Sequence, residues 1–126
     1  MVIKTVATVF GVVLLLVGIL GFIPGVTNDQ NMLLGIFHVN ALHNVIHLVS
    51  GAAALYCGMQ DAKSARMFFQ VFGVIYALVA VLGFVYGDKD ILGIVSSNMA
   101  DTWLHVVIAA TSLFFGFAVS DEVKAA

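Results

Sequence analysis

The charged residues stand so far apart along the chain that most of it is suited to the interior of a lipid bilayer. Four stretches, residues 5–28, 30–60, 67–87 and 91–120, carry no charged side chain except Asp101 in the last of them. Each is long enough for a helix to cross a hydrocarbon core, which takes about 20 residues. Backbone groups in lipid must be hydrogen-bonded within their own segment, so helices are the expected form. The sequence therefore predicts an all-α integral membrane protein with four transmembrane helices.

The composition excludes several other classes of protein. Charged residues make up 10% of the 126 residues and apolar residues 62%, whereas a soluble domain has about 25% charged residues. A net charge of −2 without a basic run gives no case for nucleic-acid binding. The single cysteine, Cys57, excludes an internal disulfide framework. We expect residues 1–126 to form one transmembrane domain.

The basic residues predict the orientation of this domain in the membrane. With four crossings, the N-terminus, the middle loop and the C-terminus share one side, which carries Lys4, Lys63, Arg66 and Lys124. The opposite side carries only Lys89. Because cytoplasmic loops are enriched in lysine and arginine, we expect both termini to be cytoplasmic.

The two halves of the chain resemble each other. Matching segments are Phe10-Gly11-Val12 with Phe72-Gly73-Val74, Leu20-Gly21-Phe22 with Leu82-Gly83-Phe84, and Leu34-Gly35-Ile36 with Leu92-Gly93-Ile94. This repeat predicts two related helical hairpins, at about residues 5–58 and 67–119. Two such hairpins would form a four-helix bundle.

Two asparagines mark where the second helix of each hairpin is expected to begin. Asn40 and Asn98 are equivalent in the repeat, and asparagine is a favoured N-cap residue. The predicted helices are then about 40–58 and 98–119, and residues 32–39 and 91–97 become short apolar lids at the outer interface. The alternative is two longer, tilted helices that start near Leu33 and Ile91.

The most distinctive segment surrounds the first asparagine. It reads Leu33-Leu34-Gly35-Ile36-Phe37 and then Val39-Asn40-Ala41-Leu42-His43-Asn44-Val45-Ile46-His47-Leu48-Val49-Ser50-Gly51. With Gly21-Phe22-Ile23-Pro24-Gly25 upstream, it resembles a bacterial family of small four-helix membrane proteins known only as a domain of unknown function, with the pattern VNxLHNxxHLxxG. The resemblance implies a multi-pass protein of the bacterial cytoplasmic (inner) membrane and carries no activity. It is weaker in the second half, where Asp101 stands at the repeat position of His43.

A polar stripe lies inside the two helices that follow the asparagines. His43 and His47 are four residues apart, as are Asp101 and His105, so each pair shares one helix face. The repeat places the two pairs at matching depth, with Asn44, Ser50, Thr102 and Ser112 as nearby polar partners. Ionisable groups inside a membrane are costly and by default indicate a functional site.

Three interpretations of this stripe remain open. His43, His47, Asp101 and His105 are a credible set of ligands for a transition metal, with zinc favoured over copper, iron or nickel. His47 and His105 alone are a possible pair of axial ligands for haem b. The four side chains can instead form an interhelical hydrogen-bond network in a structural or accessory subunit of a membrane complex. His38 has no histidine at its repeat position and is expected to be a lid residue.

Nothing else in the sequence favours an enzyme. There is no nucleophile and base pair outside the stripe, and there is no nucleotide-binding motif. The expected partners are the lipid bilayer and either a second copy of the chain or a larger membrane complex.

Overall fold

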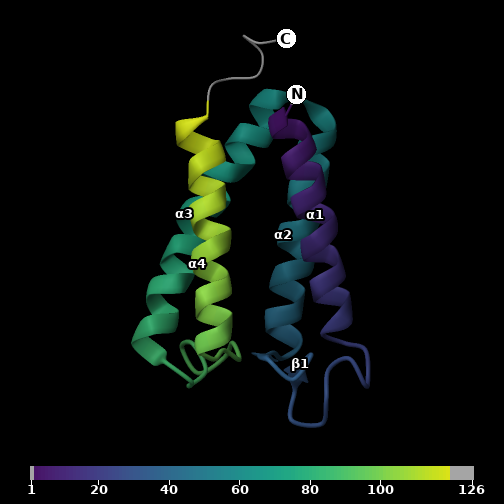
Figure 1. The fold of residues 1–126 in the computed structure, drawn as a ribbon, viewed down its shortest axis with the longest axis vertical. Coiled ribbons are helices and arrows are strands. Elements are labelled where there is room, and N and C mark those ends of the chain that lie inside the picture. The colour runs from purple at the N-terminus through teal and green to yellow at the C-terminus, as the bar shows by residue number, and fades with distance from the viewer. Residues whose placement is uncertain (1, 120–126) are drawn as a thin grey trace.

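Two antiparallel helical hairpins stand side by side in the computed structural model, which describes residues 2–119 (Figure 1). The first hairpin consists of α1 (Val2–Leu20) and α2 (Ala41–Gln60), and the second of α3 (Ala62–Tyr86) and α4 (Met99–Leu113), which continues as the π-helical η1 (Phe114–Ala118). The start of α1, the junction of α2 with α3 and the end of η1 lie at one end of the molecule, and the two long loops lie at the other (Figure 1). The predicted helical fold is confirmed.

The loop of the first hairpin contains a small sheet that the sequence did not predict. β1 (Met32–Leu33) pairs with β2 (Phe37–His38) in an antiparallel ladder, with Leu33 opposite Phe37. The turn between the strands has positive φ at Leu34 (55°) and at Gly35 (71°). The loop of the second hairpin makes a similar turn, at Leu92 (54°) and Gly93 (74°), closed by an isolated bridge between Ile91 and Val95.

Asn40 and Asn98 are the N-caps of α2 and α4, as predicted. The Asn40 side chain accepts a hydrogen bond from the His43 amide, and the Asn98 side chain accepts one from the Asp101 amide. The alternative of longer helices starting near Leu33 and Ile91 is wrong, because both residues lie in the loops.

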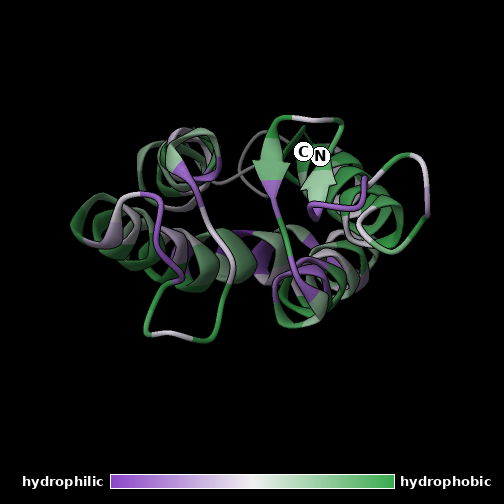
Figure 2. Ribbon diagram, turned by 90° about the horizontal axis from the view of Figure 1, so that it is seen from below, coloured by the Kyte–Doolittle hydropathy of each residue, from purple (hydrophilic) through white to green (hydrophobic). Residues whose placement is uncertain are grey.

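The same two asparagines tie the loops together. The Asn40 side-chain Nδ2 atom donates to the Ile94 carbonyl at 3.0 Å, and the Asn98 side-chain Nδ2 atom donates to the Ile36 carbonyl at 2.9 Å. Each cap therefore holds the loop of the other hairpin. Figure 2, which looks at this end of the molecule, shows both loops lying across the helix ends.

Glycines let the helices of each hairpin approach closely. A Cβ atom on Gly51 of α2 would lie 2.7 Å from the Leu15 nitrogen of α1, and one on Gly11 would lie 2.5 Å from the Leu55 nitrogen. In the second hairpin, a Cβ atom on Gly116 would lie 2.8 Å from the Gln70 nitrogen. Such contacts between small residues are the usual basis of helix pairing in membranes.

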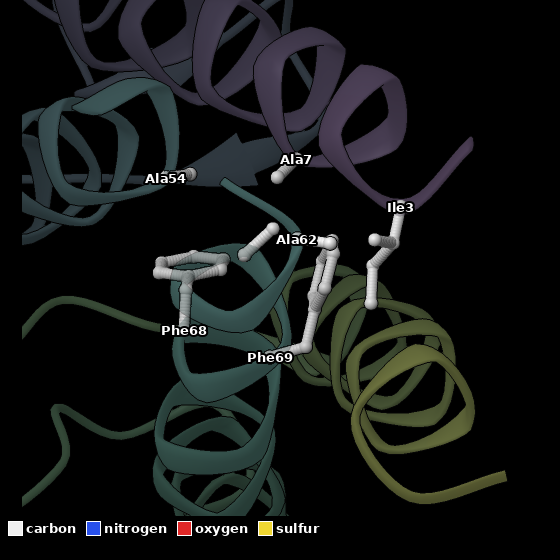
Figure 3. Packing of buried hydrophobic residues seen from close by; sticks show 7 residues of the cluster. Ile3, Ala7, Ala54, Ala62, Phe68 and Phe69 are labelled. Atoms are coloured by element: carbon white, nitrogen blue, oxygen red, sulfur yellow. The ribbon is translucent and has the colours of Figure 1, made fainter. Parts of the chain in front are cut away.

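The apolar core lies at the end opposite the loops. Phe68 and Phe69 from the start of α3 pack against Ala54 of α2 and against Ile3 and Ala7 of α1 (Figure 3). A second apolar layer lies next to it and contains Leu14, Tyr76, Ile108 and Ala109. The space between the hairpins is therefore filled by apolar side chains at this end.

Three helices are long and apolar enough to cross a membrane, namely α1, α3 and the continuous segment Met99–Ala118. The sequence predicted four such helices, and length and hydropathy support three of them. The mean hydropathy of α2 is too low for it to be the fourth. Its buried polar residues, His43, Asn44, His47 and Ser50, account for the deficit.

We predict that replacing Gly51 by Ala destabilises the first hairpin. The added methyl group would meet the Leu15 nitrogen at 2.7 Å and the Gly11 oxygen at 2.9 Å, and neither backbone atom can move away without separating the helices. We expect a loss of about 1–3 kcal/mol in unfolding free energy, measured by circular dichroism in detergent micelles titrated with sodium dodecyl sulfate. Ala52→Val changes the neighbouring exposed residue and should leave the transition unmoved. Equal stability of the two variants would contradict the close packing.

Candidate metal centre

Three of the four histidines form one buried cluster between the hairpins. His43 and His47 come from α2 and His105 comes from α4, and their exposed fractions are 3%, 3% and 4%. One potential ligand atom from each lies within 4.8 Å of the others. The ring centroids are 4.9 Å apart for His43 and His47, 5.7 Å for His43 and His105, and 6.0 Å for His47 and His105. The structure thus brings together the three histidines that the sequence predicted.

The loop before α4 sets the chemical state of His43. Its Nδ1 atom lies 2.7 Å from the Ser96 carbonyl oxygen. Because a carbonyl oxygen can only accept, Nδ1 carries the proton and donates it. In the neutral ring the Nε2 atom then carries a free lone pair. This atom lies 3.0 Å from Nε2 of His47. A histidine whose second nitrogen donates to a backbone carbonyl is the usual arrangement of a metal ligand.

The other two histidines leave one ring nitrogen each without a partner. Within residues 2–119, His47 Nδ1 and His105 Nδ1 are buried and make no hydrogen bond. An unsatisfied buried polar group costs about 1–3 kcal/mol, and most native structures contain few of them. The cluster is therefore incomplete as a hydrogen-bond network of protein atoms alone.

Asp101 lies beside the cluster and caps α4. Its Oδ2 atom accepts from the backbone N–H of Asn98 at 3.1 Å. Its own backbone N–H donates to the Asn98 side chain, and the two bonds make a capping box. Its Oδ1 atom is 4.0 Å from His43 Nε2. Sequence reasoning missed the capping role, although the spacing from Asn98 to Asp101 is typical of it. The role of Asp101 as a fourth ligand stays a prediction.

The polar residues around the histidines only partly follow the sequence expectation. Ser50 lies next to the cluster and accepts from the Tyr76 hydroxyl at 2.9 Å. Asn44 instead faces Gly21, just after the end of α1, and Thr102 faces Gly83 of α3. Ser112 is buried without a hydrogen-bond partner for its hydroxyl. His38 lies in β2 and outside the histidine group, as expected.

Two residues beside the site were missed by sequence reasoning. Tyr76 of α3 lies with its ring centroid 5.7 Å from that of His105. Its position in the middle of the apolar run of α3 is the sequence signal that could have indicated this role. Ser96 contributes through its backbone carbonyl, which no side-chain pattern reveals.

We predict that Asp101→Leu lowers the unfolding free energy by about 0.5–2 kcal/mol, the usual cost of losing a helix cap. Asp101→Asn is the matched control, because its amide oxygen can still accept from the Asn98 amide. The asparagine variant should retain most of the stability of the parent chain in the same detergent titration. A leucine variant as stable as the asparagine variant would show that the capping box contributes nothing.

Comparison with known proteins identifies a family for this chain but no activity. No curated protein and no solved structure matches the chain. A family model described as a domain of unknown function, DUF4383, matches residues 4–118. The chain belongs to this family of unknown function.

Proposed function

We propose that this protein is an integral membrane protein that holds one transition metal ion, with zinc favoured, between its two hairpins. The ligands are His43, His47 and His105, with Asp101 as the fourth. The observation that carries the proposal is the buried group of three imidazoles within 4.8 Å, in which the Ser96 carbonyl leaves the His43 Nε2 lone pair free.

The donor set agrees with the chemistry of zinc. Zinc binds imidazole nitrogen at about 2.0–2.1 Å, so two nitrogens of one tetrahedral shell lie about 3.3 Å apart. The separation of 3.0 Å between the Nε2 atoms of His43 and His47 is close to that value. With Asp101 as fourth ligand the site would be closed, which is typical of structural zinc. If Asp101 keeps only its capping role, one position stays open.

The distances support a single ion better than haem. A porphyrin held by His47 and His105 would have to lie between their rings. The His43 ring lies beside this space, at 4.9 Å from the centroid of His47 and 5.7 Å from that of His105, where the flat macrocycle would have to extend. In the alternative of a purely structural hydrogen-bond network, the His47 Nε2 atom donates to the His43 Nε2 lone pair at 3.0 Å and no metal is held.

We also propose that all four helices cross the membrane. Four polar residues of α2 are buried, namely His43, Asn44, His47 and Ser50. The exposed face beside them carries Leu42, Val45, Ile46 and Val49. A helix that hides its polar groups in this way presents an apolar surface to lipid, whatever its mean hydropathy. The close pairing of α2 with α1 along Gly51 and Gly11 supports the same depth for both helices.

The orientation proposed from the basic residues agrees with their places in the fold. Lys4 lies near the start of α1, and Lys63 and Arg66 lie near the start of α3, at the same end of the molecule (Figure 1). Lys89 lies in the loop at the opposite end. Lys124 lies outside the described residues. The end with three basic residues is proposed to face the cytoplasm of a bacterial cell.

The two hairpins are proposed to be copies of one unit. The matching turns at Leu34-Gly35 and Leu92-Gly93 support this relation. The reciprocal hydrogen bonds from Asn40 to Ile94 and from Asn98 to Ile36 support it further. Under this relation His47 and His105 are equivalent residues, and Asp101 is the equivalent of His43.

The metal proposal predicts close to one zinc per chain in full-length protein, purified in mild detergent without chelators or a histidine tag and measured by mass spectrometry of the elements. His43→Ala, His47→Ala and His105→Ala should each lose most of the metal, because each removes one of three converging ligands. His38→Ala is the control, since this histidine lies outside the group. Circular dichroism identifies any variant that fails to fold, and for such a variant His→Gln replaces His→Ala.

Two results would overturn this proposal. Folded, metal-free parent protein that takes up no zinc would favour the structural subunit. A strong Soret absorption that is lost in both His47→Ala and His105→Ala, and kept in Asp101→Ala, would favour haem b.

The topology proposal is tested by cysteine labelling in a Cys57→Ala background. A cysteine at Ser64, in the first turn of α3, should react with a membrane-impermeant maleimide only in inverted vesicles. A cysteine at exposed Asp29, in the loop of the first hairpin, should react only in intact spheroplasts. Reaction of both sites from the same side would contradict the crossing of α2, and reversed accessibility would contradict the orientation.

A further inference from the structure

A cavity of about 440 Å³ lies at the loop end of the first hairpin, between the segment that follows α1 and the start of α2 (Figure 1). Its wall combines apolar and polar side chains, among them Phe22, Ile23, Val39, Asn28, Asp29 and Asn44. It therefore offers a ligand both hydrogen-bonding groups and apolar contacts.

Asn44 brings an unpaired amide to this cavity. Only 3% of the residue is exposed, and within residues 2–119 its side chain makes no hydrogen bond. Its amide oxygen and nitrogen are not among the fully buried unpartnered atoms of these residues, so both atoms reach the open space of the cavity. An amide that is nearly buried and has no protein partner calls for a partner from outside the protein.

Thr102 holds the corresponding place in the second hairpin and is satisfied internally. It lies against Gly83 of α3, as Asn44 lies against Gly21. It is fully buried, and its hydroxyl donates to the Asn98 carbonyl at 3.2 Å. Helix packing at this level therefore does not require an asparagine, and the amide of Asn44 is free for another role.

A longer loop in the first hairpin builds the rest of the wall. The loop between α1 and α2 covers residues 21–40, whereas that between α3 and α4 covers only residues 87–98. Within the longer loop, Asn28 Oδ1 accepts from the backbone N–H groups of Gln30 and Met32, each at 3.0 Å. These bonds shape the turn that carries Asp29, which is the only charged residue in the lining of the cavity.

The charge and the free amide decide which ligand the cavity accepts. The Asp29 carboxylate attracts a cation and repels an anion. The Asn44 amide has N–H groups that donate and an oxygen that accepts. A ligand that satisfies all of them carries a cationic N–H donor and, a few atoms away, an oxygen acceptor. A primary ammonium joined to an oxygen through two carbons has these properties.

The depth of the cavity agrees with a lipid head group as one source of that ligand. At 1.5 Å per residue, the 19 residues of α1 span about 28 Å, close to the hydrocarbon core of about 30 Å. The cavity begins at Gly21, just beyond α1. With α1 and α2 crossing the membrane as proposed above, it lies among the head groups.

We propose that this cavity binds an aminoethyl group with a neighbouring oxygen, as in the ethanolamine head group of a phospholipid or in free ethanolamine. The ammonium donates to the Asp29 carboxylate and to the Asn44 oxygen, and the ligand's oxygen accepts from the Asn44 nitrogen. Phe22 and Ile23 contact its carbon chain. The binding does not depend on the metal, because the lining contains none of the proposed metal ligands.

The lipid source is tested by native mass spectrometry of the full chain in nonionic detergent. Equal amounts of phosphatidylethanolamine and phosphatidylcholine with identical acyl chains are added. Both lipids carry the same charges and the same phosphate, but the methylated ammonium of phosphatidylcholine donates no hydrogen bond. We expect about tenfold more bound phosphatidylethanolamine, the value of one or two hydrogen bonds. The preference should persist after chelator treatment, so failure of the metal site and failure of this site are distinguishable.

The soluble source is tested by nuclear magnetic resonance of the same protein. Free ethanolamine should shift the side-chain amide signal of Asn44, which is identified by its loss in Asn44→Thr, whereas choline should not. A lipid preference together with a weak response to ethanolamine assigns the site to the head group. A response to ethanolamine without a lipid preference assigns it to a soluble amine.

Two substitutions locate the binding groups. Asn44→Thr copies Thr102, and its hydroxyl should donate to the Asn40 carbonyl as Thr102 donates to the Asn98 carbonyl. This variant should fold, as shown by circular dichroism, and should lose the lipid preference. Asp29→Asn should weaken binding about two- to fivefold, the range of an exposed ion pair.

Asp90→Asn is the matched control for the charge, because Asp90 lies in the loop of the second hairpin and outside the lining. It should bind like the parent chain. Asp29 is exposed, so its variant keeps the proposal testable even where Asn44→Thr does not fold. The proposal is overturned if the parent chain shows neither the lipid preference nor the ethanolamine shift, because water alone then pairs with Asn44. It is also overturned if folded Asn44→Thr, or Asp29→Asn, binds like the parent chain.

Discussion

The hydrogen bond from His43 Nδ1 to the Ser96 carbonyl is the interaction on which the site depends. It joins α2 of the first hairpin to the loop that precedes α4 in the second. It also fixes the protonated nitrogen of His43 and so directs the Nε2 lone pair toward His47. The loop that carries Ser96 is held in turn by Asn40, which donates to the Ile94 carbonyl. The loops thus orient the cluster as much as the helices do.

The division into two hairpins explains why the polar cluster lies where it does. Within each hairpin the glycines bring the backbones together, and the buried polar side chains there are Asn44, against Gly21, and Thr102, against Gly83. Between the hairpins an apolar layer around Phe68 and Phe69 fills one end, and the histidines occupy the space toward the loops. Two grooves also open between the hairpins, one between α2 and α3 and one between α1 and α4, and His47 borders both.

Much of this arrangement follows from local sequence signals. The helix starts at Asn40 and Asn98 were predictable because N-capping depends on a single side chain near its own backbone. The convergence of His43, His47 and His105 was predictable because spacing fixes a helix face and the repeat suggests a common depth. The sequence could not show that α2 buries His43, Asn44, His47 and Ser50, so its mean hydropathy underestimates how apolar its exposed face is. The roles of Ser96 and Tyr76 depend on contacts between hairpins, which leave no local pattern. For Asp101 the sequence predicted a ligand, and the structure adds a helix-capping role that the sequence reasoning missed.

The measurement that tests the central claim most directly is X-ray absorption spectroscopy at the zinc edge of the purified full chain in detergent. Three buried imidazoles predict nitrogen neighbours at about 2.0–2.1 Å, together with the outer-shell scattering of histidine rings. Replacement of His105 by Ala should remove most of the zinc and its ring scattering, whereas His38→Ala should leave both unchanged. A spectrum of zinc surrounded by oxygen alone, with no ring scattering, would contradict the account.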